Sequence, residues 1–518
     1  MNFENPNRRN MVMALAYLPC FVGCTPKHFF SASENDVIFD SYPFALGVAS
    51  GTPTQSSIVL WTRLAPDPLL PNGGLSRAFV SVHWAVYSDA ALSQVLFSGT
   101  RQATRANAYS VHVELENLPS GKQLWYRFFS GGVASDIGRT KTLPSTTNAN
   151  ECRFAVVSCQ NYTHGYYSAY DGIVDDDPDF VLHLGDYIYE KSFGGKVRAF
   201  NLQNPPKNLN EYRQHHALHR LDKSLADAHA NLPFFLTLDN HDAVEDGEDY
   251  DPNLRAAAYK AWYEHMPVRK RFLLEKLPRA NISQAIKFGN LATINILDAR
   301  QYRSHQDICR EGIDPQFGFG NYRLNCPERL KQERTMLGMQ QETDVIRSLT
   351  TSKSCWNILA SSVPFGSYKF VDRQDERFYI GSWDGYPASR KRLIDQLEAS
   401  QIENFVVVSG DVHSNWVMDL RKDNSDIDTT YGTEIIGTSI SSGWPPPLAQ
   451  PMLDSLYENK QVHFYDMEKR GYVLNTITKS DWVAELKITE NVEQPDSKIL
   501  LLKKVVIQAG KAGVKDIN

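Results

Sequence analysis

Side chains that bind metal ions recur directly after short apolar segments of this chain. Five such segments are residues 154–158, 180–184, 234–238, 291–297 and 404–409. The polar residues that follow them are Cys159, Asp186, Asn240, His241, Asp298, Asp411 and His413. Thiolate, carboxylate, amide and imidazole groups are all metal ligands in proteins. Their recurrence after five segments predicts a shared site better than it predicts unrelated helix caps.

The first metal ion of such a site would bind sulfur, phenolate and imidazole ligands. Asp186 is the predicted bridge between two ions, because Gly185 allows a tight turn directly after the preceding segment. Tyr189, three residues further on, and Cys159 would bind the same ion as a phenolate and a thiolate. This pair favours a strongly Lewis-acidic ion such as iron, and His413 would add an imidazole.

The second ion would take oxygen ligands, and together the two ions would drive hydrolysis. Asp411 offers a carboxylate and Asn240 a neutral carbonyl oxygen, which suit Ca²⁺, Mg²⁺ or Mn²⁺. Two ions about 3.5–4 Å apart can hold the attacking and leaving oxygens of a phosphoryl displacement. A metal-bound hydroxide would be the nucleophile, and His241 would face the phosphate or the leaving group.

Each of these residues has an ordinary structural interpretation when it stands alone. A cysteine at the end of a strand is usually a small buried apolar residue. Tyr189 alone would be a packing aromatic, and His413 alone would be a hydrogen-bonded loop residue. The order Cys, Asp-x-x-Tyr, Asn-His and Asp-x-His after consecutive segments favours the functional interpretation.

The elements that must position these residues form a layered α/β domain over residues 151–518. Continuous apolar runs indicate strands that are buried on both faces. Helical patterns lie between them, around residues 212–230, 255–264 and 388–399. Ligands of such folds bind outside the carboxyl ends of the strands, where the metal-binding residues lie. His215, His216 and His219 fall on the first of these helices, and we expect them on its surface.

Residues 40–148 have a different pattern and predict a small β-sandwich. Alternating apolar and polar residues at 57–64, 79–87, 109–115 and 123–129 indicate strands, and Gly- and Pro-containing turns separate them. The phrase Leu118-Pro119-Ser120-Gly121 is similar to the strand entry of fibronectin-type sandwiches. No convergent set of ligands occurs here, so we expect a packing domain that a polar linker at 144–150 joins to the next.

Residues 1–30 have the features of an export signal. Arg8 and Arg9 precede an uncharged apolar run that is too short to span a bilayer, and the pair resembles a twin-arginine signal. The stretch Phe21-Val22-Gly23-Cys24 resembles a lipobox, although Phe21 replaces the usual leucine. We therefore expect an exported protein, periplasmic, secreted or at the cell surface, whose only membrane contact is a lipid at Cys24. The alternative is that residues 1–30 are an ordinary export signal in which Cys24 is not lipidated.

Composition excludes some partners and leaves one pairing open. The 518-residue chain has 54 Lys+Arg against 60 Asp+Glu, so no basic excess points to nucleic acid as a stable partner. Seven cysteines mean that at least one lies outside an internal disulfide. Cys309 and Cys326 flank a Gly-containing loop and are either a disulfide or two free thiols. Cys152 and Cys355 are predicted to be structural.

The motifs together resemble the PhoD-type alkaline phosphatases of the metallophosphoesterase superfamily. The similarity covers nearly the whole chain after residue 40. The segments that carry it are Ser158–Gln160, Leu184–Glu190, Asn240–Asp242, Gly410–His413, Phe44–Gly51, Leu60–Leu64, Asp298–Arg303 and Ser382–Pro387.

The resemblance implies a four-layer αββα catalytic domain behind the sandwich. It implies hydrolysis of phosphomonoesters, and in some cases diesters, with Fe³⁺ and one or more Ca²⁺ ions. The iron ligands would be Cys159, Asp186, Tyr189 and His413, and the calcium ligands would be Asp186, Asn240 and Asp411. Two alternatives stay open: a phosphodiesterase or phospholipase on the same scaffold, and a noncatalytic phosphate-binding surface protein.

The chain departs from the family pattern at one ligand, and several neighbouring residues allow two interpretations. The family usually has Asp-Asp-His where this chain has Asp239-Asn240-His241. Arg300 is a candidate for contacting phosphate, or it pairs with a carboxylate. Trp383 and Tyr386 line the mouth of the pocket or pack in a loop. The acidic tract 246–251 is a solvated loop or helps to bind a further calcium ion.

Overall fold

The computed structural model describes residues 37–145, 149–243, 251–273, 279–311, 321–372, 375–422, 430–444 and 448–518. The predicted export signal at 1–30 lies outside these ranges, as does the acidic tract except for Asp251. Asp251 caps the helix that follows it, because its side chain accepts a hydrogen bond from the backbone N–H of Asn253.

Two large mixed sheets form the centre of the molecule. The first has ten strands in the order β25 (Asp516–Ile517), β24 (Ile499–Gln508), β23 (Asp481–Thr489), β22 (Gly471–Thr478), β9 (Glu151–Val157), β10 (Phe180–His183), β11 (Pro233–Leu236), β1 (Val48–Gly51), β2 (Ile58–Arg63) and β5 (Ser110–Leu115). The second has seven strands in the order β12 (Gln284–Phe288), β13 (Ala292–Ile296), β15 (Trp356–Ser361), β18 (Phe405–Ser409), β20 (Thr430–Ile436), β19 (Asn415–Arg421) and β21 (Val462–Asp466).

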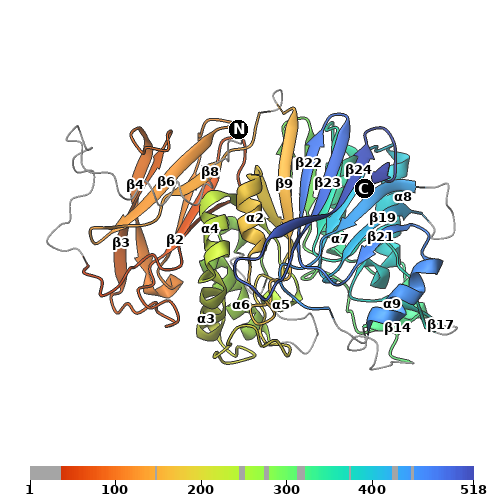
Figure 1. Cartoon of the computed structure of the whole chain (residues 1–518), viewed down its shortest axis with the longest axis horizontal. Helices are drawn as coiled ribbons and strands as arrows, with labels where there is room; N and C mark the ends of the chain where they lie inside the picture. Colours follow the sequence, from red (N-terminus) through yellow and green to blue (C-terminus); the bar gives the residue numbers. More distant parts are fainter. Residues whose placement is uncertain are drawn as a thin grey trace, which may run out of the picture.

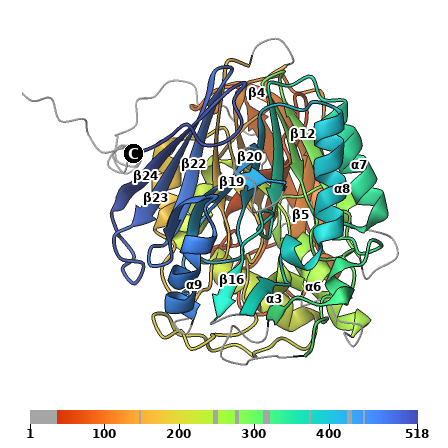
Figure 2. The ribbon, with the colours of Figure 1, turned by 90° about the vertical axis from the view of Figure 1, so that its right-hand side faces the viewer.

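Helices cover the outer faces of the two sheets. They are α2 (Ala169–Asp176), α3 (Leu209–Arg220), α4 (Lys223–Asn231), α6 (Pro252–His265), α7 (Gly338–Thr350), α8 (Pro387–Ala399) and α9 (Ala449–Ser455), whereas the short helix α5 (Asn240–Ala243) lies beyond the end of β11. Figure 1 shows α2, α3, α4 and α6 between the N-terminal strands and the central sheets. On the opposite side α7 and α8 lie side by side (Figure 2). Among the described residues, no helix is both long and apolar enough to cross a membrane.

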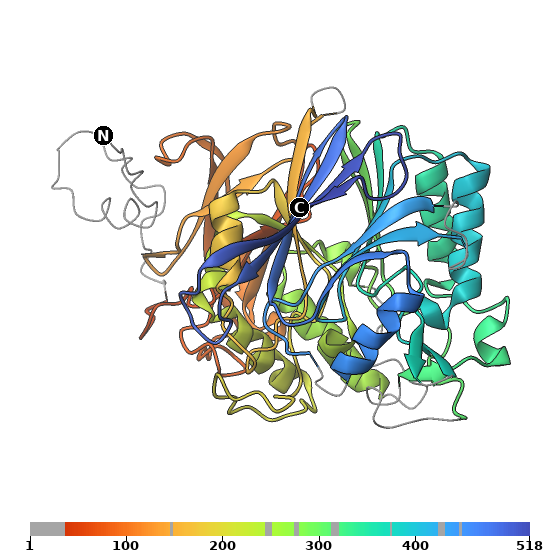
Figure 3. The same cartoon turned by 45° about the vertical axis from the view of Figure 1, so that its right-hand side comes forward.

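Three apolar cores separate these layers and give the order helix, sheet, sheet, helix. Along β10, Phe180 and Leu182 point into the core between the sheets, and Val181 points into the core beneath α2 and α4. This alternation explains the continuous apolar run, because both faces of the strand are covered. A further core joins the seven-stranded sheet to α7 and α8 through Leu349 and Leu393. Figure 3 shows the two sheets facing each other with helices outside.

The N-terminal region consists mostly of strands and is continuous with the central sheet. A separate N-terminal sheet contains β4 (Val95–Thr104), β3 (Phe79–Tyr87), β6 (Gln123–Ser130) and β7 (Val133–Ala134), and β8 (Gly138–Lys141) also pairs with β6. It packs on β1, β2 and β5 through a shared core that includes Leu60, Trp84 and Tyr126. Strand β1 in turn pairs in parallel with β11, with Ser50 opposite Pro233. Three strands before residue 148 therefore belong to the sheet that carries the site.

The predicted helix over 212–230 is two helices, and its histidines are not on the surface. The side chain of Asp222 accepts a hydrogen bond from the backbone N–H of Leu225 and so begins α4. His215, His216 and His219 are fully buried, which corrects the expectation of a solvated face. The ring of His216 stacks on His265 with 5.1 Å between ring centroids, because α3 packs against α6. A neutral imidazole can be buried in this way, and burial lowers the pKa of His219 to about 3.

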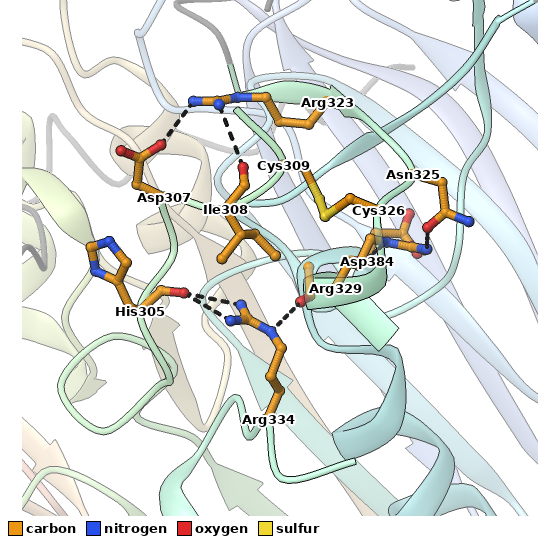
Figure 4. Close-up of a disulfide and its surroundings, with 11 residues drawn as sticks. His305, Asp307, Ile308, Cys309, Arg323, Asn325, Cys326, Arg329, Arg334 and Asp384 are labelled. Carbon is orange, nitrogen blue, oxygen red and sulfur yellow. Dashed lines mark hydrogen bonds and ion pairs between the residues drawn. A yellow bond between two sulfur atoms is a disulfide. The ribbon is translucent and has the colours of Figure 1, made fainter. Parts of the chain in front are cut away.

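Cys309 and Cys326 form a disulfide, which resolves the open pairing. Figure 4 shows arginines on either side of it. Arg323 donates a hydrogen bond to the carboxylate of Asp307 at 3.2 Å, and Arg329 donates one to the side-chain oxygen of Asn325 at 2.8 Å. The disulfide lies close in the chain to β14 (Tyr322–Leu324), which forms a small sheet with β17 (Asp375–Tyr379) and β16 (Phe370–Asp372).

Removing this disulfide should lower stability measurably. The two cysteines are 17 residues apart, and closing a loop of this size is worth about 3 kcal/mol in the chain-entropy model. We expect Cys309→Ser/Cys326→Ser to shift the denaturant midpoint down by a corresponding amount. A reducing agent should produce the same shift in the wild type and none in the double variant. Equal midpoints for oxidised and reduced wild type would contradict this prediction.

Candidate active site

Neighbouring strand ends of the first sheet meet a strand end of the second sheet at one place. Strands β9, β10 and β11 are adjacent and parallel, so Cys159, Asp186 and Asn240 leave the sheet at the same edge. A Cβ atom on Gly410, after β18, would lie 2.6 Å from the Ser158 hydroxyl oxygen. A side chain there would press on Ser158, and this close approach brings the end of β18 to the end of β9.

The predicted tight turn before Asp186 is present. Gly185 has φ +99°, and a Cβ at this position would lie 2.5 Å from the backbone nitrogen of Asp239. The carbonyl oxygen of Gly185 accepts a hydrogen bond from the backbone N–H of Cys159 at 3.1 Å. The turn therefore aligns the loop after β10 with the loop after β9.

Four of the predicted ligands converge. The ligand atoms of Cys159, Asp186 and His413 all lie within 4.8 Å of one another. The Tyr189 hydroxyl lies 2.9 Å from Asp186 Oδ2 and 3.0 Å from His413 Nε2. His413 Nδ1 is 2.8 Å from the carbonyl oxygen of Gly443. Since that carbonyl can only accept, Nδ1 carries the proton and the lone pair of Nε2 faces the group, as in a metal-ligating histidine.

The backbone of four predicted ligands, one of them Asp411, is held in an unfavourable conformation. Cys159, Asp186, Asp411 and His413 have φ of +58°, +54°, +72° and +50°. A left-handed conformation at a residue other than glycine costs on the order of 1–3 kcal/mol and is found preferentially at functional sites. Four such residues at one place indicate that the fold is organised to present their side chains.

The electrostatics of the group favour a cation. Burial raises the pKa of the Cys159 thiol well above its ordinary value, and the carboxylates of Asp186 and Asp239 raise it further. Burial and the charge of Asp186 likewise raise the pKa of Tyr189. Burial raises the pKa of Asp186 to about 6, and burial lowers that of His413 to about 3. All four groups are therefore disfavoured as bare charges but suited to bind a positive ion.

Arg300 lies against a second set of oxygens. Its guanidinium donates hydrogen bonds to Asn240 Oδ1 at 3.2 Å and to Asp411 Oδ1 at 2.9 Å. It also forms an ion pair with Asp239. The structure thus places Arg300 in the site and shows the carboxylate pairing that the sequence left as one of two options. Asp239 Oδ2 is buried and has no hydrogen-bond partner among the described residues.

His241 stands beside the group of four ligands. Its Nδ1 lies 2.7 Å from a carboxylate oxygen of Glu190, and its ring stacks on Tyr189 with 4.3 Å between centroids. Burial alone would lower the pKa of His241, but the charges of Asp186 and Glu190 outweigh it and raise the pKa to about 9. The described residues form no hydrogen bond with its Nε2, which leaves that nitrogen for a ligand.

Sequence reasoning missed three carboxylates of the site. Asp239 precedes Asn240 at the same strand end, and Glu190 follows Tyr189, so both lay inside the motifs. Asp242 accepts hydrogen bonds from the backbone N–H groups of Asp186, Tyr187, Ile188 and Asp239. It thereby fixes the two loops against each other. A signal existed for Asp242, since an aspartate after a strand commonly accepts from nearby backbone N–H groups.

Other residues singled out from the sequence lie elsewhere. The carboxylate of Asp298 accepts hydrogen bonds from the backbone N–H groups of Arg300 and Gln301, so it shapes its own turn. Trp383 and Tyr386 are fully buried in the core between the seven-stranded sheet and α8. The packing interpretation of these two aromatics is the one that the structure shows.

Comparison with known proteins agrees with this geometry. The model of the PhoD-like phosphatase family matches residues 154–486, and the model of its N-terminal domain matches residues 31–144. The chain belongs to the PhoD-like phosphatase family. The predicted family and enzyme class, a phosphoric ester hydrolase, are thereby confirmed.

Relatives of this PhoD-like chain extend over most of its length. It is 38% identical over 505 residues to alkaline phosphatase D of Bacillus subtilis strain 168, covering 93% of this chain and 83% of that protein. A solved structure of PhoD is 36% identical, covers 92% of this chain and 93% of its own, and has a TM-score of 0.85. A purple acid phosphatase from yellow lupin is 12% identical, covers 91% and 73%, and has a TM-score of 0.50, which shows a shared fold.

Proposed function

We propose that this PhoD-like phosphatase hydrolyses phosphomonoesters at a site that holds one Fe³⁺ ion and at least one Ca²⁺ ion. The observation that carries the proposal is the convergence of Cys159, Asp186, Tyr189 and His413. A thiolate, a phenolate and an imidazole around one carboxylate suit a strongly Lewis-acidic ion.

The residues present fit both ions. Two of the four groups that would hold iron, the Cys159 thiol and the Tyr189 hydroxyl, carry pKa values far above their ordinary range because they are buried. Binding of a trivalent ion compensates that cost by deprotonating them. Asp186, Asn240 and Asp411 would hold calcium through oxygen atoms, with Asp239 as a further oxygen. Its buried Oδ2 atom has no partner among the described residues, and a hard divalent ion supplies one.

The chain's own residues orient the ester and move protons. When bound, the ions would activate a water molecule and neutralise phosphate charge. Arg300 adds a fixed positive charge beside Asn240 and Asp411. His241, held through Nδ1 by Glu190, directs Nε2 at the substrate, where it donates a hydrogen bond to a phosphate oxygen or a proton to the leaving oxygen.

We propose that residues 1–30 direct export, to the periplasm, the cell surface or the medium, and that Cys24 is the point of any lipid attachment. We further propose a fibronectin-like identity for the sandwich at 40–148, in front of a catalytic domain at 151–518. The support for this identity is the apolar core that the sheet of β4, β3, β6 and β7 shares with β1, β2 and β5.

Comparison of a monoester with a diester tests the substrate class. A monoester dianion carries more charge than a diester anion, and the site presents Arg300 and His241 as well as its ions. We expect kcat/KM for p-nitrophenyl phosphate to exceed that for bis(p-nitrophenyl) phosphate at least tenfold, measured on the metal-loaded enzyme. Both substrates release the same alcohol, so leaving-group chemistry is matched. A preference for the diester would favour the phosphodiesterase, and no turnover of either would favour the noncatalytic binding protein.

A further inference from the structure

Phe193 is an exposed aromatic residue beside the catalytic histidine. Its side chain is 46% exposed. The Phe193 ring lies edge-on to His241 with 5.0 Å between ring centroids, and 6.0 Å from the Tyr189 ring. An apolar ring that stays in water next to a polar site forgoes the stabilisation that burial would give it. Its position beside the His241 ring therefore requires an explanation.

The backbone holds this ring in place at a cost. Phe193 has φ +48° and Gly194 has φ +84°. A left-handed conformation is costly for a bulky residue, by on the order of 1–2 kcal/mol. An asparagine or a glycine would adopt it more easily, so the phenylalanine is not explained by the turn itself. We therefore look for the role of this position in the aromatic side chain and not in the backbone turn.

The loop that carries Phe193 is fixed by tight packing. The Thr163 hydroxyl donates a hydrogen bond to the carbonyl oxygen of Ser192 at 2.8 Å, and the Thr163 carbonyl accepts one from Val197 at 2.9 Å. A Cβ atom on Gly195 would lie 2.2 Å from the Thr163 hydroxyl oxygen. These contacts fix the backbone on either side of Phe193, and the ring lies against His241 and Tyr189.

His164, which follows Thr163, connects the Phe193 loop to His413, a proposed metal ligand. The Gly443 N–H donates a hydrogen bond to His164 Nδ1 at 2.9 Å, and the Gly443 carbonyl contacts His413. The other side of His164 faces the carbonyl groups of Phe193 and Ser192, which oppose the effect of burial in lowering its pKa. Through this chain of contacts, Phe193 and His413 are positioned relative to each other.

We propose that Phe193 is a specificity-determining residue that receives the organic group of the phosphate ester. The phosphate would bind at the cluster of Cys159, Asp186, Tyr189 and His413, with the leaving oxygen toward His241. The organic part of the ester would then extend past the His241 ring to Phe193. The favoured substrates are therefore phosphate esters with an aromatic or other apolar group next to the phosphate. Esters of small polyols gain nothing from this ring. The inference rests on the proposed phosphatase function and deepens it by naming the substrate class.

The test separates apolar binding from catalysis. We would measure binding of phenylphosphonate and methylphosphonate, which are not hydrolysed, to the metal-loaded wild type, Phe193→Ala and Phe193→Trp by calorimetry. Phe193→Ala should weaken phenylphosphonate about tenfold, the size expected for loss of an aromatic contact, and methylphosphonate less than twofold. Phe193→Trp should retain the preference. Phe79→Ala, which removes a phenylalanine that is 59% exposed on β3, should change neither affinity.

Turnover provides a second measurement. For Phe193→Ala, kcat/KM should fall about tenfold for phenyl phosphate and little for glycerol 2-phosphate, relative to wild type in each case. Equal losses for both compounds, or no loss for either, would overturn the proposal, because Phe193 would then act through His241 or not at all. If the wild type hydrolyses no monoester but binds phenylphosphonate through Phe193, the phosphatase proposal fails, whereas the contact of Phe193 with the organic group stands. A wild type that binds neither phosphonate overturns both.

Discussion

Replacing Asp186 by asparagine should reduce hydrolysis at least about a thousandfold and release metal. Asp186 is the carboxylate around which the ligand atoms of Cys159 and His413 gather within 4.8 Å. It also accepts a hydrogen bond from the His241 backbone N–H at 3.1 Å. An amide binds cations weakly and cannot bridge two of them with charge, so both proposed ions lose affinity. Loss of several kcal/mol of transition-state stabilisation corresponds to this rate effect.

The fold should survive this change. Asparagine has the shape of aspartate, and burial makes the charge of Asp186 unfavourable in the metal-free protein, with repulsion from Asp239 as a smaller contribution. We therefore expect metal-free Asp186→Asn to melt no earlier than the metal-free wild type.

A second aspartate serves as a matched control. Asp176 accepts a hydrogen bond from the Tyr472 hydroxyl at 2.6 Å, as Asp186 does from Tyr189, but it lies at the end of α2. Asp176→Asn should keep both activity and metal, measured by turnover of p-nitrophenyl phosphate and by elemental analysis. Wild-type turnover by Asp186→Asn would show that the proposed mechanism is wrong.

Replacing Cys159 by alanine should remove iron selectively. The Cys159 thiol is fully buried, and burial raises its pKa well above the ordinary value. In the proposed iron site it would become a thiolate, and among the described residues no other cysteine belongs to the cluster of Cys159, Asp186 and His413. We expect iron affinity to fall by about a hundredfold, with calcium retained more fully, because the proposed calcium ligands are oxygens.

Colour provides the direct measurement. An Fe³⁺ ion bound by the Tyr189 phenolate absorbs visible light, so the wild type should be coloured and Cys159→Ala should bleach. Cys152→Ala is the matched control, since Cys152 is equally buried but lies in the core between the two sheets. Retained iron and colour in Cys159→Ala would exclude the thiolate ligand. A colourless wild type that contains only zinc would refute the metal assignment and leave the fold unaffected.

Local sequence patterns identified residues that lie together in the structure, because the strand ends that carry them are local features. A continuous apolar run marks a strand covered on both faces, and the residue after it must leave the sheet at a definite edge. Gly185 likewise predicted the tight turn before Asp186. In the structure, φ +99° and the close approach to Asp239 exclude a side chain at this position. The same logic misjudged His216, whose burial against His265 depends on how α3 packs on α6.

Pairing between distant segments was not visible in those patterns. The ion pair of Arg300 with Asp239 joins residues 61 positions apart, and the pairing of β1 with β11 joins segments nearly two hundred residues apart. In the sequence, Arg300 cannot be distinguished from an arginine that is exposed to solvent. The segment of β1 likewise cannot be distinguished from a strand at the edge of a sheet. The boundary drawn near residue 148 reflected a change of pattern, whereas the hydrogen-bonded sheet crosses it.

The sequence by itself determined the strand ends, the order of the candidate ligands along the chain and, through its motifs, the phosphatase family. These depend on which residues are buried on one element and on the conformation of one turn, and neighbours in the chain settle both. The tertiary structure alone decided that β18 meets β9, that Arg300 faces carboxylates and that Phe193 stands exposed over His241. Those outcomes depend on which surfaces pack together, because contacts over long sequence separation select the partners of each side chain.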